Sequence, residues 1–371
     1  MDEKIKKLVV IGANDFQNQL ILKAKERGFE THVFAWQDGA IGERTADYFY
    51  PISIVEKEAI LEECRKIQPD GVISIASDLA AITVNYVAEH LGLTGNGMES
   101  AMLATNKYKM RKAFEQNGDP SPKNYRSDEI TDEIVAQMCF PLIIKPVDRS
   151  GSRGITKIAG KEELSDAIRI AEEYSFDKKA MVEEFADGEE YSVEYISYHG
   201  KHTFLALTQK FTTGAPHFIE TGHLQPAPVD VATLERVKSI VEHALDTLKI
   251  QNGASHSEIK INNDGQIKII EIGGRMGGDC IGSDLVQIST GYDFVNMVID
   301  VACGEEPCFE KVCEPAVAKI EFIFCPEDMK KVEKIQKEAP ESIYRISEIE
   351  PFDGHKVVDS SSRYGYIITR K

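Results

Sequence analysis

Apolar runs and amphipathic stretches alternate along the first part of the chain. Residues 8–12 and 70–75 are short apolar runs, typical of buried parallel strands. Helical periodicity covers residues 15–27, 55–67 and 78–90. This alternation predicts an open parallel sheet with helical crossovers. Ligands bind such sheets at the carboxyl ends of the strands, here Gly12 to Asn14 and Ala76 to Asp78. The first of these ends lacks Gly-x-Gly-x-x-Gly, so a dinucleotide site is not expected.

Beyond residue 95, helix-like and strand-like stretches follow one another less regularly. Helices are predicted over residues 100–117, 128–138, 161–174, 230–249, 282–290, 293–303 and 328–338. Strands are predicted over residues 142–145, 154–158, 179–184, 189–198, 201–210, 256–261, 266–271 and 316–325. The expected fold class is therefore α/β and α+β. We expect three units: an N-terminal open parallel sheet (residues 1–95), a central domain (96–310) and a small α+β C-terminal subdomain (311–371).

Two of the predicted strands form a hairpin that carries a pair of glutamates. With the turn at Asn262–Gly265, Glu258 and Glu271 fall opposite each other. Cross-strand neighbours lie about 4.5–5.5 Å apart at Cβ, so two carboxylates there repel unless a cation lies between them. Oxygen ligands at this spacing suit Mg²⁺ bridging the phosphates of a nucleotide. Solvated glutamates on a surface hairpin are the ordinary alternative, but such a hairpin does not need the glycine-dense loop 273–279 around Arg275.

A second candidate region begins at Lys145, which ends an apolar strand and precedes a Gly/Ser-rich loop, residues 146–154. Such a lysine and loop can place an ammonium group and backbone N–H groups around a polyphosphate. This is not the Walker sequence, because the lysine precedes the loop. The strand 181–186 could then pair with adenine through its backbone, and Glu190 could accept a ribose hydroxyl. An ordinary acidic hairpin is the alternative for these glutamates.

The order of these parts resembles the ATP-grasp superfamily. The shared elements are an early lysine in a helix, a lysine with a glycine loop, a Glu-rich hinge, two metal carboxylates and an arginine. Within the superfamily the chain looks closest to carboxylate–amine ligases of the amino-acid ligase and carbamoyl-phosphate-synthetase-like group. The features that point there are the segments 217–223, 271–279 and 361–366. The resemblance implies a pre-ATP-grasp domain, an ATP-grasp domain with a lid at 146–154, and the C-terminal subdomain.

The resemblance also implies roles for particular residues. It assigns Lys107 and Lys145 to the ATP phosphates, and Ser150, Gly151, Ser152, Arg153 and Gly154 to the loop that closes over them. It assigns Glu183, Phe185 and Ala186 to adenine, the last two through their backbone, and Glu190 to ribose. Glu258 and Glu271 would bind Mg²⁺ or Mn²⁺. Arg275, with Lys145, would be catalytic and would stabilise the transferring phosphoryl group and the acyl phosphate.

The substrate and metal assignments are less complete. Glu220 and His223 are candidates to bind the amine, together with Arg275, and His256 is a weaker candidate. Many members of the superfamily have Asn two residues after the second metal glutamate, where this chain has Gly273. A ligand to a second ion is therefore missing or replaced by water, so the resemblance implies one or two ions.

Composition narrows the range of partners. The 371 residues include 43 basic and 61 acidic side chains, a formal charge of −18. Such a chain is a poor candidate for binding nucleic acid or an anionic membrane, because the attraction to phosphate is missing. No apolar run approaches the roughly 18 residues of a membrane span.

Seven irregularly spaced cysteines suggest reduced thiols in the cytoplasm. The set Cys303, Cys308 and Cys313 lacks the spacing of a zinc site. The sequence does not decide the oligomeric state, and a homodimer is one of the possibilities.

These features predict an ATP-dependent ligase that activates a small carboxylate, expected to be an amino acid, as an acyl phosphate. The activated group is then joined to an amine, with release of ADP and phosphate. A purine-pathway or bicarbonate-using ATP-grasp enzyme is the nearest alternative. A nucleotide-binding regulatory protein without ligase activity is the alternative from another class.

Overall fold

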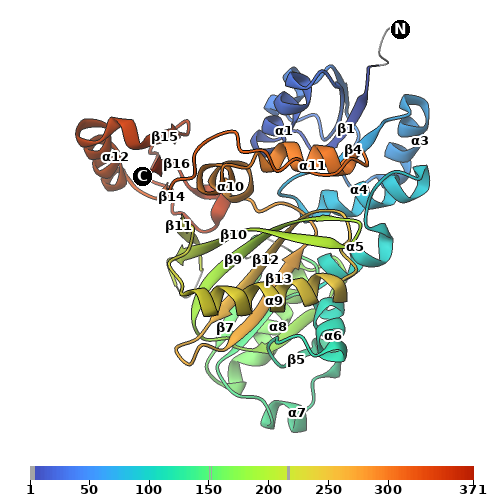
Figure 1. The fold of residues 1–371 in the computed structure, drawn as a ribbon. Coiled ribbons are helices and arrows are strands. Elements are labelled where there is room, and N and C mark those ends of the chain that lie inside the picture. The colour runs from blue at the N-terminus through green and yellow to red at the C-terminus, as the bar shows by residue number, and fades with distance from the viewer. Residues whose placement is uncertain (1–4, 150, 152, 215–217) are drawn as a thin grey trace.

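The computed structural model describes residues 5–149, 151, 153–214 and 218–371 (Figure 1). Its N-terminal part is a four-stranded parallel sheet in the order β3-β2-β1-β4. The elements are β1 (Lys7–Ile11), α1 (Asp15–Glu26), β2 (Glu30–Phe34), α2 (Ile41–Thr45), β3 (Tyr48–Tyr50), α3 (Lys57–Ile67), β4 (Gly71–Ile73) and α4 (Asp78–Leu91). The predicted open parallel sheet is confirmed. The β4 strand ends at Ile73, and a short loop leads from it to Asp78, which opens α4.

The predicted helix 100–117 is wrong in one respect, because two helices occupy this range. They are α5 (Gly97–Thr105) and α6 (Lys107–Asn117). The side chain of Asn106 accepts a hydrogen bond from Lys109 N at 3.0 Å and caps α6. Asn is among the residues preferred at this position, because its side chain satisfies a backbone N–H that the helix leaves free. The break places Lys107 in the first turn of α6.

A small antiparallel sheet follows, in the order β5-β8-β6-β7. Its region contains β5 (Asn124–Arg126), η1 (Ser127–Glu129), α7 (Asp132–Ala136), β6 (Leu142–Pro146), β7 (Thr156–Ile158), η2 (Lys161–Glu163), α8 (Leu164–Tyr174) and β8 (Ala180–Glu184). The predicted helix 128–138 is wrong. Thr131 starts a new helix there by accepting a hydrogen bond from Ile134 N, so a 3₁₀ turn and a short helix replace it.

The largest sheet has eight strands in the order β13-β12-β9-β10-β11-β14-β16-β15. Its central elements are β9 (Glu189–Tyr198), β10 (Lys201–Thr212), β11 (Glu220–Gln225), α9 (Val231–Thr247), β12 (Gly253–Ile261) and β13 (Ile267–Gly273). Its C-terminal elements are β14 (Ala318–Ile323), α12 (Pro326–Glu338), η4 (Pro340–Ser342), β15 (Ile343–Ile346), η5 (Ser360–Ser362) and β16 (Gly365–Arg370). Pairing of β11 with β14 makes the C-terminal strands a continuation of the central sheet. The division at residue 310 therefore stays a prediction.

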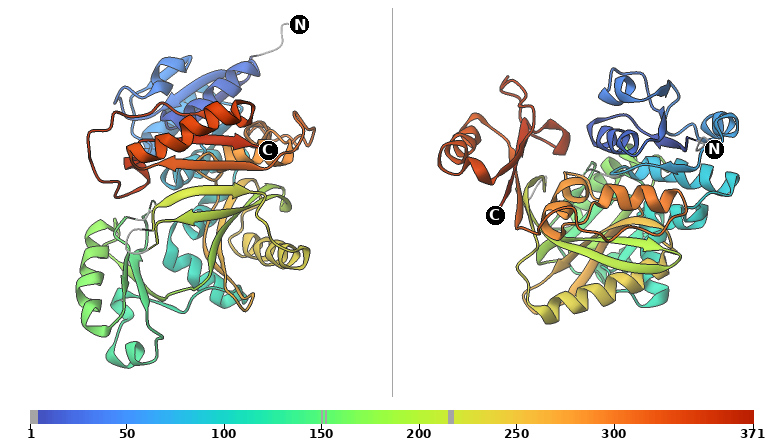
Figure 2. Two further views of the ribbon diagram at one scale, coloured as in Figure 1. Left: turned by 90° about the vertical axis from the view of Figure 1, so that its left-hand side faces the viewer. Right: turned by 45° about the horizontal axis from the view of Figure 1, so that its top comes forward.

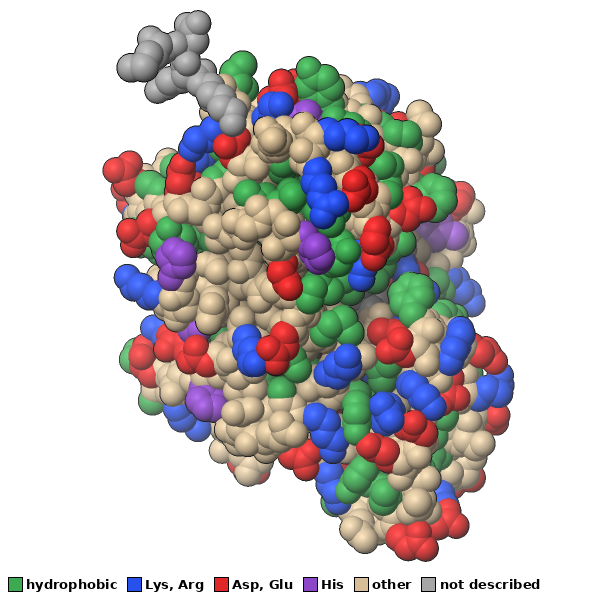
Figure 3. All heavy atoms as spheres, turned by 90° about the vertical axis from the view of Figure 1, so that its right-hand side faces the viewer, with side chains coloured by type: hydrophobic (Ala, Val, Ile, Leu, Met, Phe, Trp, Pro, Cys, Tyr) green, Lys and Arg blue, Asp and Glu red, His purple; other side chains and the backbone are tan. Residues whose placement is uncertain are grey.

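Three helices connect β13 to the C-terminal strands. They are the π-helix η3 (Ile281–Leu285), α10 (Val286–Thr290) and α11 (Phe294–Ala302). The predicted helix 282–290 therefore begins as a wider π-helical turn. In Figure 2, right, the blue N-terminal part and the red C-terminal part stand on the same side of the central sheet. Figure 3 shows another face, where basic and acidic side chains are interspersed rather than separated by sign.

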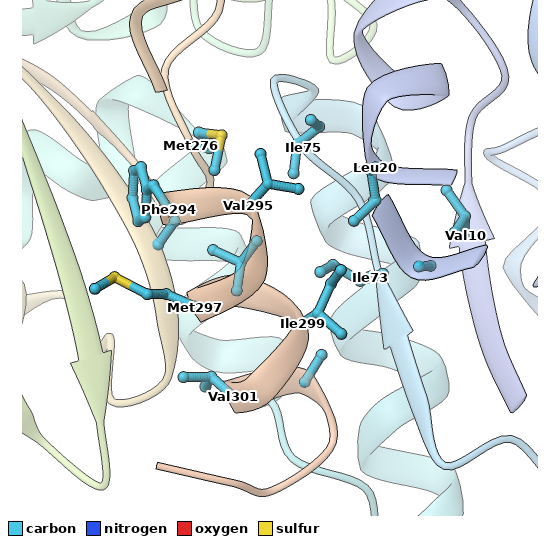
Figure 4. Packing of buried hydrophobic residues seen from close by; sticks show 14 of the residues in the cluster. Val10, Leu20, Ile73, Ile75, Met276, Phe294, Val295, Met297, Ile299 and Val301 are labelled. Atoms are coloured by element: carbon cyan, nitrogen blue, oxygen red, sulfur yellow. The ribbon is translucent and has the colours of Figure 1, made fainter. Parts of the chain in front are cut away.

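Helix α11 is the main apolar contact between the N-terminal sheet and the central domain (Figure 4). Phe294 and Ile299 on α11 are buried in one cluster with Leu20 of α1, Ile73 of β4 and Met276. Fully burying each such side chain contributes roughly 1.5–3 kcal/mol. The cluster therefore fixes the end of β4, and Asp78 beyond it, against the loop that carries Arg275. Among the described helices, none has the length and apolarity to cross a membrane.

Substitution at the centre of this cluster tests its contribution. Ile299 is fully buried, so Ile299→Ala should lower the free energy of unfolding by about 2–5 kcal/mol. Val312→Ala, at a side chain that is 56% exposed, should change it by less than about 0.5 kcal/mol. Urea unfolding measures both variants. Equal effects would contradict the view that α11 holds the two parts together.

Candidate active site

A cavity of about 1080 Å³, including its open mouth, lies where both antiparallel sheets meet α6 and the start of α4. Most residues predicted for the site line it: Lys107, Lys145, Gly151, Glu183, Phe185, Ala186, Glu190, Glu220, Glu258, Glu271 and Arg275. His256, the weaker candidate, lines it as well. Arg153 lines a neighbouring cavity instead, and Gly154 lines neither. Ser150 and Ser152 lie outside the described residues.

Strand alternation produces much of the cavity wall. Along β9, Glu190 and Glu194 point to one face of the sheet, while Tyr191, Val193 and Tyr195 point to the other and pack with α9. On the neighbouring strand β12, Lys260 pairs with Glu190 and His256 pairs with Glu194. The polar residues of two adjacent strands therefore form one charged surface, and the apolar residues between them form the core.

The two hairpin glutamates are direct cross-strand partners, as the sequence predicted. In the structure each carboxylate contacts a lysine. Lys107 Nζ lies 2.5 Å from Glu271 Oε1, and Lys210 Nζ lies 2.6 Å from Glu258 Oε1. The paired carboxylates therefore attract positive charge at the place expected for a metal ion. Two carboxylates with phosphate oxygens form an oxygen donor set that suits Mg²⁺.

Lys210 of β10 is the main site residue that the sequence did not reveal. Its ammonium group is also 3.0 Å from Glu190 and 3.6 Å from Glu220, and the side chain is nearly fully buried. Burial alone would lower the pKa of Lys210, but the surrounding carboxylates raise it well above its ordinary value. A lysine near the end of a strand belongs to no motif, so only the alternation that also places Glu190 could have indicated it.

Lys145 belongs to a buried charge cluster with Glu183 and Arg111. Glu183 forms an ion pair with Lys145 and accepts a hydrogen bond from Arg111 Nε at 3.2 Å. Arg111 also donates to the carbonyl of Ile270 at 2.6 Å, so the cluster ties α6 to β13. Burial would raise the pKa of Glu183, but Lys145 and Arg111 outweigh it and lower the pKa. The Glu183 side chain is thus bonded to Lys145 and Arg111 in this structure, and its predicted contact with adenine stays a prediction.

Arg275 is held by a residue of the N-terminal part. Its Nε and Nη2 donate to the two oxygens of Asp78 at 2.7 and 3.1 Å. Gly273 makes room for this pair, because a Cβ atom there would lie 3.0 Å from Asp78 Oδ1 and 3.2 Å from Arg275 Nε. Burial acts to lower the pKa of Arg275, but Asp78 raises it above its ordinary value. Asp78 lies at the predicted carboxyl end of a strand, so the sequence indicated the place but not the partner.

His256 forms a buried ion pair with Glu194, its cross-strand partner. Glu194 also accepts a hydrogen bond from Gly277 N at 3.0 Å. Any Cβ atom at position 277 would lie 2.7 Å from both Glu194 Oε1 and His256 Nδ1, which explains the glycine. Burial would lower the pKa of His256, but Glu194 raises it to about 9. His256 therefore adds a positive charge to the cavity wall at neutral pH.

The predicted contact of His223 with the amine stays a prediction, and the structure places this side chain away from the cavity surface. His223 is fully buried and does not line the cavity, although it is the cross-strand partner of Lys210. Its ring lies edge-on to Phe322, with Nε2 3.7 Å from Asp279 Oδ2. The residues that cover the His223 ring come from β14 and from the loop after Arg275. No local sequence signal connects these segments with His223. Glu220, by contrast, reaches the cavity.

Two residues in the first half of the loop 146–154, Asp148 and Arg149, are anchored by other parts of the chain. Lys107 Nζ donates to the carbonyl of Arg149 at 2.8 Å, and the Arg149 guanidinium lies 4.1 Å from the ring of Phe176. Asp148 accepts hydrogen bonds from the backbone of Phe176 and Asp177 at 3.1 and 2.8 Å. The position of the loop's first residues therefore depends on α6 and on the turn after α8.

Comparison with known proteins identifies the central fold. Residues 138–284 match the family model of the ATP-grasp domain, a range that includes Lys145, Glu258, Glu271 and Arg275. The chain contains an ATP-grasp domain. Two solved structures resemble this fold over nearly the whole chain. An L-amino acid ligase from Bacillus licheniformis has a TM-score of 0.80 at 22% identity, with 99% of this chain and 94% of that chain covered. A phosphoribosylglycinamide synthetase from Anaerococcus prevotii has the same TM-score and coverage at 21% identity. At these identities the likeness shows the ATP-grasp fold alone.

Two curated relatives are ligases. Alanine–anticapsin ligase of Bacillus subtilis (strain 168) is 28% identical over 293 residues, 70% of this chain and 61% of that protein. D-alanine–D-alanine ligase of Stutzerimonas stutzeri (strain A1501) is 26% identical over 221 residues, 56% of this chain and 67% of that protein. The chain thus spans about three fifths of the length of the first of these relatives.

The His256–Glu194 pair predicts how stability depends on pH. Because its folded-state pKa is raised to about 9 from an ordinary 6.5, protonated His256 stabilises the fold below about pH 6.5. This contribution, on the order of 3 kcal/mol, is lost as the pH rises towards 9. In Glu194→Gln the pKa of His256 should fall, and this part of the pH dependence should disappear. Urea unfolding between pH 6 and 9 measures it; an unchanged slope would contradict the pairing.

Proposed function

We propose that the protein is an ATP-dependent ligase that activates a small carboxylate as an acyl phosphate and joins it to an amine. The observation that carries the proposal is the convergence of Lys107, Lys145 and Arg275 with Glu258 and Glu271 in one cavity of an ATP-grasp domain. The ligase names of the curated relatives support it. We propose an amino acid as the carboxylate, in keeping with those names.

The nucleotide would lie along the edge where the two antiparallel sheets meet. Phe185 and Ala186 follow β8 and would contact adenine, with the backbone pairing to the base. Lys157 of β7 and Lys260 of β12 lie 3.5 and 4.8 Å from the centre of the Phe185 ring, so ammonium groups from both sheets contact it. Glu190 would accept a ribose hydroxyl once Lys210 turns towards the phosphates.

Charge decides the first chemical step. A carboxylate that attacks the γ-phosphorus of ATP brings one anion towards another, so the site must neutralise the approach. Lys107 and Lys145 would bind phosphate oxygens, and Arg275, held by Asp78, would face the transferring group. Mg²⁺ held by Glu258 and Glu271 would neutralise phosphate charge. The carboxylate oxygen forms a bond to phosphorus while the bond to the ADP oxygen breaks.

The second step forms the amide. The amine nitrogen attacks the carbonyl carbon of the acyl phosphate, phosphate leaves with the bonding electrons, and the nitrogen loses a proton. Water would destroy the acyl phosphate, so the segment 146–154 would close over it. The Glu220 carboxylate reaches the same cavity and would accept a hydrogen bond from an N–H group of the amine substrate.

Hydroxylamine tests this chemistry directly, because it attacks an acyl phosphate faster than water does. With ATP and Mg²⁺, the protein should convert at least one of the twenty proteinogenic amino acids into a hydroxamate and release one ADP for each. Bicarbonate and acetate in separate reactions test the bicarbonate-using alternative and a carboxylate without an amino group. Absence of hydroxamate with every carboxylate would favour a nucleotide-binding protein without ligase activity.

Substitution of Arg275 distinguishes an effect on the chemical step from an effect on nucleotide binding. Because its guanidinium would face developing charge, Arg275→Ala should slow hydroxamate formation about 100- to 1000-fold, with much less effect on ATP affinity. Arg275→Lys should recover little, since a point charge cannot replace a planar fork bonded to Asp78. Single-turnover rates and nucleotide binding measure the two effects. Weaker ATP binding with an unchanged rate at saturation would move Arg275 to a ground-state role.

The metal assignment has its own test. Glu271→Gln should abolish ADP formation and lower the number of Mn²⁺ ions bound with ADP, as counted by electron paramagnetic resonance. Glu115→Gln, on the solvent side of α6, is the control and should leave both unchanged. Full turnover by a folded Glu271→Gln protein would contradict the assignment.

A further inference from the structure

A short C-terminal segment, Asp359 to Arg363, lies against the cavity wall that carries Glu220. It contains η5 and precedes β16, and the Asp359 side chain caps it by accepting hydrogen bonds from Ser361 N and Ser362 N. Two of its residues reach β11. Ser360 Oγ donates to Glu220 Oε2 at 2.7 Å, and Arg363 Nη1 donates to the Glu220 carbonyl at 3.3 Å. The segment therefore holds both the side chain and the backbone of one cavity residue.

The guanidinium of Arg363 donates hydrogen bonds from Nε, Nη1 and Nη2. Its Nη1 and Nη2 donate to the two oxygens of Asp279 at 3.0 and 2.6 Å, and its Nε donates to the Ser360 carbonyl at 2.8 Å. The guanidinium also lies 3.6 Å from the centre of the Phe322 ring. The side chain is 8% exposed. A two-pronged pair of this kind fixes direction as well as distance, which a single ammonium cannot do.

Asp279 ends the glycine loop that begins after Glu271. It has a positive φ of 51°, a conformation that non-glycine residues adopt only when surrounding contacts enforce it. Arg363 supplies such contacts from the C-terminal subdomain. The loop from Arg275 to Asp279 is thus held at its first residue by Asp78 and at its last residue by Arg363. Its middle is held by Glu194 through Gly277.

Glu220 lies between two constraints. Ser360 binds one carboxylate oxygen, and Lys210 is 3.6 Å from the other. If Lys210 turns to phosphate when nucleotide binds, Ser360 and Arg363 are the contacts that keep Glu220 in place. The Glu220 oxygen that faced Lys210 could then accept a hydrogen bond from an N–H group of a ligand in the cavity.

We propose that Ser360 and Arg363 are positioning residues that hold Glu220 in the amine subsite, so that the C-terminal segment sets affinity for the amine substrate but not for ATP. This rests on the proposed function, in which Glu220 accepts an N–H of the amine. A purely structural clamp between the subdomain and the sheet would instead affect both substrates, or neither, through overall stability.

Neighbouring serines provide a matched test. Ser360→Ala removes the hydroxyl that reaches Glu220. Ser361→Ala removes a hydroxyl whose hydrogen bond, among the residues that the structure describes, goes to Asp359 at 2.8 Å. The carboxylate is the amino acid that gives the most hydroxamate, and the amine is the amino acid that then gives the fastest ADP release without hydroxylamine. With this pair, Ser360→Ala should raise KM for the amine about 10-fold and change KM for ATP less than 2-fold. Ser361→Ala should resemble the wild type. Equal kinetics for the two variants, or a parallel rise in both KM values for Ser360→Ala, would overturn the proposal.

Arg363→Lys keeps the charge and removes the fork, so it should raise KM for the amine at least as much as Ser360→Ala. Urea unfolding of each variant shows whether a kinetic effect follows from lost stability. Amide hydrogen exchange gives a readout that needs no substrate. Residues 219–225 should exchange faster in Ser360→Ala than in Ser361→Ala, and identical exchange would overturn the positioning role. If wild-type protein forms no hydroxamate, the proposed function fails; if it does and the serine variants agree, only this inference fails.

Discussion

Moving a charged side chain out of water costs several kcal/mol unless an opposite charge and hydrogen bonds meet it inside the protein. This constraint organises the cavity. Lys145 is paired with Glu183, Lys210 with Glu258, and Arg275 with Asp78, and every one of these side chains is largely buried. Since the members of the last pair come from different parts of the chain, pairing the charges also fixes how those parts meet.

The pairs differ in what a ligand could do to them. Glu183 is enclosed by Lys145 and Arg111, so this cluster can keep its pairing when a nucleotide binds. Lys107 and Lys210 instead lie on the two carboxylates of the hairpin, where a divalent cation would be placed. In the proposed function, metal and phosphate would exchange partners with these groups: the glutamates would bind the cation and the lysines would bind phosphate oxygens. Each charge would then be paired before and after binding, so binding need not leave a buried charge unpaired.

Much of this arrangement is predictable from local sequence. Alternation gave the hairpin and the opposition of Glu258 and Glu271, and the apolar runs gave the parallel sheet that ends near Asp78. Resemblance to a superfamily was needed for Lys107, because a lysine in a helix has no local signal of function. The break at Asn106 differs from the single predicted helix, although an Asn at a helix start is a recognised signal.

What could not be predicted depends on contacts between distant segments. Lys210 is an ordinary strand residue until three carboxylates surround it, and His223 is an ordinary polar strand residue until Phe322 and Asp279 cover it. Gly273 shows the same limit. In the sequence it is a missing ligand, whereas in the structure it makes room for the pair that holds Arg275.

The exchange of partners between lysines, glutamates, metal and phosphate is tested most directly by a crystal structure with Mg²⁺ and a non-hydrolysable ATP analogue. We predict that Glu258 and Glu271 both bind the metal, and that the ammonium groups of Lys107 and Lys210 move to phosphate oxygens. The pairs Lys145–Glu183 and Asp78–Arg275 should persist. A complex in which Lys107 and Lys210 still contact the two glutamates, with the metal bound elsewhere, would contradict the exchange.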